Sequence, residues 1–281
     1  MLKLRDGIVE LYKKVATSIP PDIEEALKSS YENETRGSGA RSSLGIILEN
    51  IKLARKTVRP VCQDTGIPVF FVRVPAGLSQ VELKKSFVEA TRIATERIPL
   101  RTNAVDIITE KNSGDNTGTG FPVIYFEEVQ GGTLTIDLML KGGGCENAGQ
   151  IYKLPAEELN AQRDLDGVRK CVIDTVQKAQ GRGCPPYILG VGVGGSIDQV
   201  AGLAKRQLLC KLTDTNRIGE LVKIEERLLR EINELGIGPL GLGGESTAIG
   251  VKIGVNHRHP ASYFVDVSVS CWANRRGRLI W

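Results

Sequence analysis

Apolar residues recur along this chain with two different spacings, and the spacing separates helices from strands. Leu4, Ile8, Leu11 and Val15 lie three or four residues apart, which predicts an amphipathic helix. Comparable patterns predict further helices over residues 21–27, 44–56, 81–97, 156–162, 167–180, 196–212 and 217–235. Apolar or β-branched runs predict strands over residues 68–74, 122–127, 133–140, 187–193, 247–255 and 263–270. The intermixed order predicts an α+β fold, with a mixed β-sheet flanked by several helices.

Glycine and proline mark the connections between these elements. Gly131-Gly132 predicts a hairpin turn between the strands at 122–127 and 133–140. Residues 36–43 (RGSGARSS) predict a flexible, turn-rich stretch, and residues 236–246 predict a glycine-rich loop. The pattern contains no clean linker and no internal repeat. We therefore expect residues 1–281 to form a single catalytic domain.

Charge and composition narrow the partners of the chain. The formal net charge is +4, the basic residues are spread out, and only 5% of residues are aromatic, so nucleic-acid binding is a weak hypothesis. The first residues, MLKLRDGIVELYKK, carry charges throughout and lack an apolar segment of signal-peptide length. No apolar run reaches membrane-spanning length. We expect a cytoplasmic protein that acts on a small anionic molecule.

Three cysteines in glycine- or proline-marked loops carry the candidate chemistry. They are Cys62 in PVCQDTGIP, Cys184 in GRGCPPY and Cys271 in VSVSCWANRRG. None has a second cysteine at CxxC spacing, which disfavours a zinc ribbon or a dithiol redox site. Three separate thiolates suit an iron–sulfur cubane with one iron left open as a Lewis acid. The alternatives are a buried loop cysteine beside a turn-forming Asp64, and a core Cys271 followed by a solvated basic tail.

The segment GVGVGG offers a competing function. Gly190, Gly192 and Gly195 match the G-x-G-x-x-G pattern of dinucleotide-binding loops, between an expected strand and helix. A Rossmann unit also needs a second strand and an acidic residue about 20 residues later. That region reads LLCKLTDTNRIGE, which favours a helix and a turn. An NAD-dependent dehydrogenase is therefore the weaker alternative.

The remaining polar and sulfur-bearing residues divide into two groups. Cys171 and Cys210 lie among apolar residues at helical spacing, and we expect both to be buried in the core. Cys145 follows three glycines that permit a ligand to approach the backbone closely, so its role is open. The only histidines are His257 and His259. Their spacing indicates either a metal site or a loop histidine placed over a substrate, and the sequence favours the two interpretations equally.

Taken together, these motifs resemble those of the iron–sulfur-dependent hydro-lyases, the class I fumarases and L(+)-tartrate dehydratases. The resemblance is to the alpha subunit and covers essentially the whole chain. It is carried by CQDTG, LR, GDN, KGGG, GCPPY, GVGVGG, GPLGLGG and SCWANRR, in that order along the sequence. The resemblance implies a [4Fe–4S] cluster bound in loops at strand ends, with Cys62, Cys184 and Cys271 as its ligands.

The resemblance also implies roles around the cluster. Gln63, Arg101 and backbone near Gly144 would bind substrate, whereas Asp64 and His259 would be catalytic. The family pattern gives no role to His257. Cys145 stands where many members carry serine and is not counted as a ligand. At GGES (residues 243–246) the chain again departs from the common pattern, which leaves the role of Glu245 open.

The sequence-based hypothesis is an alpha subunit that hydrates fumarate to malate or dehydrates tartrate. The chain ends ten residues after Cys271. The resemblance implies further catalytic groups, which single-chain members of the family carry in a C-terminal domain. We therefore expect a β subunit as partner, and a dimer or an αβ heterotetramer. The sequence does not choose between fumarate, tartrate or another C4 dicarboxylate. A non-catalytic iron–sulfur subunit is the other alternative.

Overall fold

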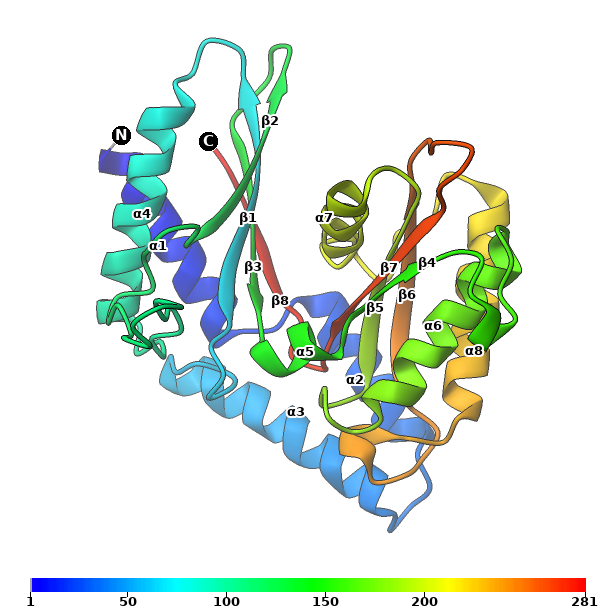
Figure 1. Cartoon of the computed structure of the whole chain (residues 1–281). Coiled ribbons are helices and arrows are strands. Elements are labelled where there is room, and N and C mark those ends of the chain that lie inside the picture. The colour runs from blue at the N-terminus through cyan, green and yellow to red at the C-terminus, as the bar shows by residue number, and fades with distance from the viewer. Residues whose placement is uncertain (1) are drawn as a thin grey trace. The chain divides into compact units, whose positions relative to one another are not determined.

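The computed structural model describes residues 2–281 and confirms the α+β class (Figure 1). The chain folds into two compact units, each assembled from separate stretches of sequence. The first comprises Met1–Pro20, Asn50–Gly143 and Arg275–Trp281, and the second comprises Pro21–Glu49 and Gly144–Asn274. Because the chain passes between the units repeatedly, no single linker is visible in the sequence. The expected single catalytic domain over residues 1–281 stays a prediction.

The first unit is a four-stranded sheet with helices on one face. The strand order is β2-β1-β3-β8, with β1 parallel to β2 and antiparallel to β3. Helices α1 and α4 cover one face and bury Ile8, Phe70, Phe87 and Leu138 between helix and sheet (Figure 1). The elements are α1 (Leu2–Thr17), β1 (Ile67–Pro75), α4 (Gln80–Arg97), β2 (Val123–Val129), β3 (Thr135–Lys141) and β8 (Arg275–Ile280).

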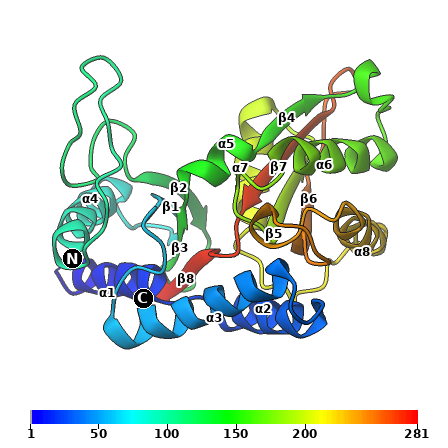
Figure 2. The same ribbon diagram turned by 90° about the horizontal axis from the view of Figure 1, so that it is seen from below.

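The second unit is a four-stranded sheet with helices on both faces. Its order is β4-β7-β5-β6, and α7 lies on the opposite side of the strands from α6 and α8 (Figures 1 and 2). The elements are α2 (Pro21–Asn33), α5 (Gly143–Ala148), β4 (Gln150–Lys153), α6 (Leu165–Ala179), β5 (Tyr187–Val193), α7 (Ile197–Gln207), α8 (Gly219–Glu234), β6 (Ala248–Val255) and β7 (Phe264–Ser270), with short 3₁₀ turns at Glu157–Leu159 and Pro239–Gly241. Helix α3 (Gly39–Thr57) runs from this unit into the first.

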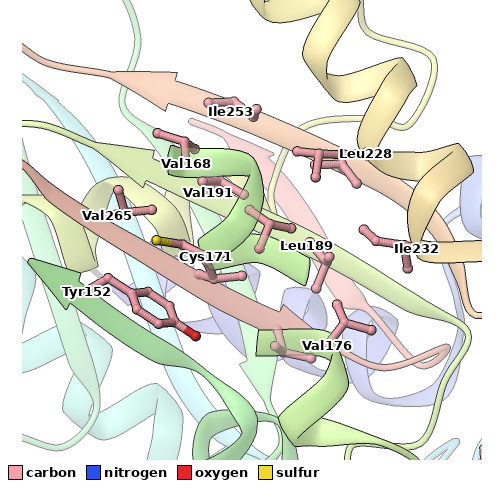
Figure 3. Packing of buried hydrophobic residues seen from close by; sticks show 14 of the residues in the cluster. Tyr152, Val168, Cys171, Val176, Leu189, Val191, Leu228, Ile232, Ile253 and Val265 are labelled. Carbon is pink, nitrogen blue, oxygen red and sulfur yellow. The ribbon is translucent and has the colours of Figure 1, made fainter. Parts of the chain in front are cut away.

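The core of the second unit explains the burial of Cys171. Val168, Cys171 and Val176 of α6 pack with Leu228 of α8 over Leu189 of the sheet, among other apolar residues (Figure 3). Cys171 is fully buried there. Burial raises the pKa of its thiol to about 12. The predicted core role of Cys171 is thus confirmed.

The hairpin predicted at Gly131-Gly132 is wrong. Strands β2 and β3 are not neighbours, because β1 lies between them. Six of the nine residues of β1 are buried, and this strand takes a central place that a local turn signal does not reveal. Figure 1 shows β2 and β3 on either side of β1.

Several other boundaries also differ from the sequence-based elements. Helix α3 starts within the stretch predicted to be flexible, because the Ser38 hydroxyl accepts a hydrogen bond from the Arg41 N–H at 3.1 Å and caps it. The helix predicted over 156–162 is only a 3₁₀ turn. The helix predicted over 196–212 ends at Gln207, so Cys210 lies in a turn and is only half-buried, not in the core. Over residues 2–281, no helix is both long and apolar enough to cross a membrane.

Candidate functional site

In the first unit, the motifs meet at one edge of the sheet. Ile67 at the start of β1 pairs with Lys141 at the end of β3, and Leu140 pairs with Arg275 at the start of β8. The loop before β1, the loop after β3 and the beginning of β8 therefore converge. We call residues 62–66, 141–143 and 275 the first-sheet edge. It brings together CQDTG, the first three residues of KGGG and Arg275 of SCWANRR.

Asp64 organises this edge through both carboxylate oxygens. Its Oδ1 accepts the N–H of Gly66 at 3.0 Å, and its Oδ2 accepts the N–H of Gly143 at 2.8 Å. The two loops on either side of the carboxylate are thereby joined. Hydrogen bonds to a charged acceptor are among the stronger ones in proteins. Asp64 therefore fixes the shape of the Cys62 loop.

Arg275 is buried at the same edge, where sequence reasoning had allowed a solvated basic tail. Arg275 is only 2% exposed, so the solvated-tail interpretation is wrong for this residue. One guanidinium nitrogen donates to the backbone carbonyl of Asp64 at 2.6 Å. Its Nε has no hydrogen-bond partner among residues 2–281. A buried positive charge thus stands beside the Cys62 loop. No sequence pattern predicted β8, whose first residues are mostly charged.

A second network fixes the backbone around Arg101. The Thr65 hydroxyl accepts the Arg101 N–H at 3.0 Å. Asn116, which is buried, accepts the Asn103 N–H at 2.6 Å and donates to the Arg101 carbonyl at 2.9 Å. The backbone of Arg101 is held on both sides while its side chain is exposed. Asn116 belongs to the GDN motif, whose segment could have been read as a surface turn. Its supporting role was not predicted.

Gly66 is required by close contact between two backbones. A side chain at Gly66 would place its first carbon 2.8 Å from the carbonyl carbon of Leu140, and φ at Gly66 is +81°. Both conditions exclude other residues. The Asn103 side chain donates to the Gly66 carbonyl at 3.0 Å and Asn50 donates to the Val61 carbonyl at 2.8 Å. The half-buried Cys62 and exposed Gln63 therefore sit in a loop that is tied at both ends.

In the second unit, Cys184 and Cys271 come together at one edge of the other sheet. Ile188 near the start of β5 pairs with Ser270 at the end of antiparallel β7. The Trp272 N–H donates to the Cys184 carbonyl at 3.3 Å and joins the two loops directly. Residues 183–187 and 270–272 form what we call the second-sheet edge. Both cysteines lie in loops at strand ends, as the sequence led us to expect.

The backbone at Cys184 adopts an uncommon conformation. Its φ is +57°, which is rare for a residue with a side chain, and its N–H donates to the Gly181 carbonyl at 3.1 Å. The side chain of Cys184 is exposed and that of Cys271 is half-buried. Left-handed residues other than glycine concentrate at functional sites because surrounding structure must hold them. The observation supports a functional role for the GCPPY segment.

The Tyr187 hydroxyl holds the loop that precedes Cys184. It donates to the Gln180 carbonyl at 2.6 Å and accepts the Gly183 N–H at 3.1 Å. Burial is the main cause that raises the pKa of Tyr187, and negative charge on Cys145, Cys184 and Cys271 raises it further. The three thiols are therefore within electrostatic range of the Tyr187 phenol. Cys145 is also buried and its thiol contacts the Gly183 carbonyl at 3.5 Å.

The glycines of GVGVGG are explained by helix packing. A side chain at Gly190 would place its first carbon 2.2 Å from the Ala204 carbonyl oxygen, and one at Gly192 would lie 2.4 Å from that of Val200. Both glycines let α7 lie directly on β5. The parallel neighbour of β5 is β6, and the region that would hold a ribose-binding strand forms turns. The packing removes the main support for a dinucleotide site.

His259 lies in an exposed loop shaped by its neighbour Arg258. The Arg258 guanidinium donates to the carbonyls of His259 and Pro260 at 3.1 and 2.9 Å. The Nδ1 of His259 accepts the Ala261 N–H at 3.1 Å, an assignment that leaves Nε2 as the protonated nitrogen of the neutral ring. His257 is exposed in the same loop. The loop presents His259 Nε2 as a potential donor.

The donor set fits an iron–sulfur cluster, since thiolates are its usual ligands. Cys184 and Cys271 lie at one edge, and no cysteine of residues 2–281 forms a disulfide. The described chain has no group of three His, Cys, Asp or Glu side chains arranged for a single metal ion. Of the predicted site residues, Cys62, Gln63, Asp64 and Arg101 belong to the first unit, whereas Gly144, Cys184, His259 and Cys271 belong to the second.

Comparisons with known proteins match nearly the whole chain. The model of a family described as fumarate hydratase (Fumerase) matches residues 5–279. A putative class I fumarate hydratase of Geobacillus stearothermophilus is 44% identical over 279 residues, which is 98% of this chain but 54% of that protein. The chain thus spans about half the length of that relative.

Two alpha subunits match at closer to full length. A putative L(+)-tartrate dehydratase subunit alpha of Methanocaldococcus jannaschii is 36% identical over 280 residues, covering 98% of this chain and 96% of that one. The L(+)-tartrate dehydratase subunit alpha of Escherichia coli (strain K12) is 34% identical over 280 residues, covering 99% and 90%. With a family match over residues 5–279 and these relatives, the chain belongs to the fumarate hydratase family.

Proposed function

We propose that this chain is the alpha subunit of a [4Fe–4S]-dependent hydro-lyase that hydrates fumarate to malate or dehydrates tartrate. The observation that carries the proposal is the second-sheet edge, where the Cys184 and Cys271 loops are joined by the Trp272–Cys184 backbone hydrogen bond. The names of two relatives support the substrate class. A C4 dicarboxylate is common to both names.

Cys62, Cys184 and Cys271 are the proposed ligands. Cys184 and Cys271 come from loops at the ends of β5 and β7, and Cys62 comes from the loop before β1. When bound, a cluster with one iron not held by cysteine supplies a Lewis acid that polarises the C–O bond of the substrate. A fourth protein thiolate would close that position. We therefore exclude Cys145 from the ligand set, although it lies near Tyr187.

The chain's own side chains would bind and orient the dicarboxylate. The exposed, planar guanidinium of Arg101 can bind a carboxylate through two parallel hydrogen bonds. Its backbone is fixed by Thr65 and Asn116, so the side chain projects from a rigid base. Gln63 and the backbone at Gly144, both exposed, would supply hydrogen bonds to carboxylate or hydroxyl oxygens.

Asp64 and His259 are the proposed catalytic residues. Asp64 would assist the proton transfer while its carboxylate keeps the bonds to Gly66 and Gly143. His259 would donate from Nε2 to the substrate, because its Nδ1 is taken by the Ala261 N–H. Orienting both groups around one bound substrate lowers the entropic cost of the reaction.

A β subunit would complete the enzyme with a general base and further carboxylate-binding groups. The alpha-subunit names of the relatives support this part of the proposal. We expect a dimer of alpha or an αβ heterotetramer. The cytoplasmic location expected from the sequence stays a prediction.

Anaerobic reconstitution with iron and sulfide tests this function. We expect the absorbance of a cluster in the chain alone, little turnover, and turnover of fumarate or tartrate after the β subunit is added. Full activity of the chain alone would refute the need for a partner. A cluster without turnover beside the β subunit would instead indicate a binding role. Tight nicotinamide binding without iron would favour the dehydrogenase. Assays on both acids would identify the substrate.

A further inference from the structure

The glycine-rich loop over residues 236–246 has no role in the function proposed above, yet it is firmly anchored. Glu34, which follows α2, is 3% exposed. Its carboxylate accepts the Glu245 N–H at 3.0 and 3.1 Å and the Ser246 N–H at 2.9 Å. Burying a carboxylate is costly unless hydrogen bonds satisfy it. Here the donors are backbone N–H groups of the loop.

Gly244 makes room for this carboxylate. A side chain at Gly244 would place its first carbon 2.7 Å from a Glu34 carboxylate oxygen and 2.6 Å from the Ala40 side chain, and its φ is +122°. The Arg41 guanidinium donates to the Glu34 carbonyl at 2.9 Å and fixes the backbone that carries Glu34. The anchor therefore has two matched parts, a buried carboxylate and a residue without a side chain opposite it.

The same loop lies against the segment that carries Cys184. The Leu240 N–H donates to the Pro185 carbonyl at 2.8 Å. A side chain at Gly241 would place its first carbon 2.7 Å from the Gly181 Cα, so the two backbones touch with no side chain between them. Contacts therefore run from Glu34 through the loop to both sides of Cys184. They lie within the second unit.

The contact between the loop 236–246 and the Cys184 segment can support the strained backbone at Cys184. A residue with a side chain at φ +57° persists only where its surroundings hold it. The Leu240–Pro185 hydrogen bond is adjacent to that residue. We propose that Glu34 is a positioning residue for Cys184, acting through the loop 236–246. The proposal rests on the assignment of Cys184 as a cluster ligand.

Hydrogen exchange and thiol alkylation of the metal-free chain test the proposal. In Glu34→Ala, loss of a charged acceptor should speed exchange of the Glu245 and Ser246 amides by about tenfold or more. Iodoacetamide should also alkylate Cys184 faster, because its loop loses support. Glu34→Gln keeps one acceptor oxygen and should show smaller changes. The control is Glu32→Ala, since Glu32 is exposed and only its backbone carbonyl bonds to Arg41.

Iron content after anaerobic reconstitution completes the test. It should fall in Glu34→Ala and fall less in Glu34→Gln, while Glu32→Ala matches wild type. If Glu34→Ala does not fold, Glu34→Gln and Gly244→Ala are compared with wild type instead. Amide exchange, Cys184 alkylation and iron content should then change in Glu34→Gln and change more in Gly244→Ala. Unchanged exchange would refute the anchor, and faster exchange with unchanged Cys184 alkylation and iron would refute the positioning role. If wild type itself takes up no iron, the cluster proposal fails, whereas exchange and alkylation still decide the role of Glu34.

Discussion

The two cysteine-bearing edges are held together by different means. At the first-sheet edge, side chains hold the Cys62 loop, chiefly the Asp64 carboxylate and the buried Arg275. At the second-sheet edge, backbone donors have a larger part: the Trp272 and Leu240 N–H groups bond to the Cys184 segment, alongside the one side chain of Tyr187, whose hydroxyl bonds to Gly183 and Gln180. The motifs of the two edges therefore contribute to the structure in different ways. In the first unit they name side chains that bond, and in the second many name glycines that leave space.

The largest expected effect comes from filling such a space. Gly192→Ala would place a methyl group 2.4 Å from the Val200 carbonyl oxygen and should force α7 away from β5. We expect a loss of about 3 kcal/mol in the free energy of unfolding. Urea denaturation measures it. In the control Gly118→Ala nothing lies within 4 Å of the new methyl group, and the change should stay within about 1 kcal/mol. Equal effects of the two substitutions would contradict the packing role of Gly192.

The first-sheet edge should instead lose stability when a side chain is replaced by one of nearly the same volume. Asp64→Asn replaces one acceptor oxygen by a donor that faces the Gly66 or Gly143 N–H. We expect a loss of about 1–3 kcal/mol in the free energy of unfolding, in addition to any loss of turnover. Denaturation and kinetics of the same sample separate the two. Asp6→Asn, in an exposed pair with Arg5, is the control. Wild-type stability of Asp64→Asn would show that the carboxylate does not hold the loop.

A smaller effect should distinguish substrate binding from support of the loop. Arg101→Lys keeps the charge but loses the planar fork. In the complex with the β subunit, we expect KM to rise about tenfold, from one weakened charged hydrogen bond, with iron content unchanged. Arg97→Lys is the control, because Arg97 is exposed at the end of α4. If KM stays at its wild-type value, Arg101 does not contact the substrate.

The smallest effect concerns a thiol outside both edges. Because burial raises the pKa of Cys171 to about 12, its thiol stays protonated at pH 9 in the folded chain. Alkylation at pH 9 followed by peptide mapping should modify the exposed Cys184 and spare Cys171. An unfolded cysteine titrates near 8.5–9, so this thiol stabilises the fold below that range and the contribution is lost as pH rises toward 12. Rapid modification of Cys171 would mean that the core opens readily.

Sequence patterns predicted most elements because their signals are local. The apolar runs of β5 and β7 and the periodicity of α1 and α4 lie within single segments. The order of strands was not predictable, since β1 separates β2 from β3 through burial that no local pattern records. The resemblance supplied the candidate residues around the cluster. Its motifs contain Asn116 and Arg275 but did not reveal their supporting roles, and Glu34 lies outside them. Each of the three acts on backbone groups distant in sequence.

Iron content of two cysteine variants tests the central claim, that ligands come from both edges. Cys145, Cys184 and Cys271 all lie near Tyr187, so these three thiols are the rival ligand set. After anaerobic reconstitution of the full chain, we expect Cys62→Ala to lose the cluster and Cys145→Ala to keep it, with iron and sulfide counted per chain. Full cluster content in Cys62→Ala, together with its loss in Cys145→Ala, would contradict the account.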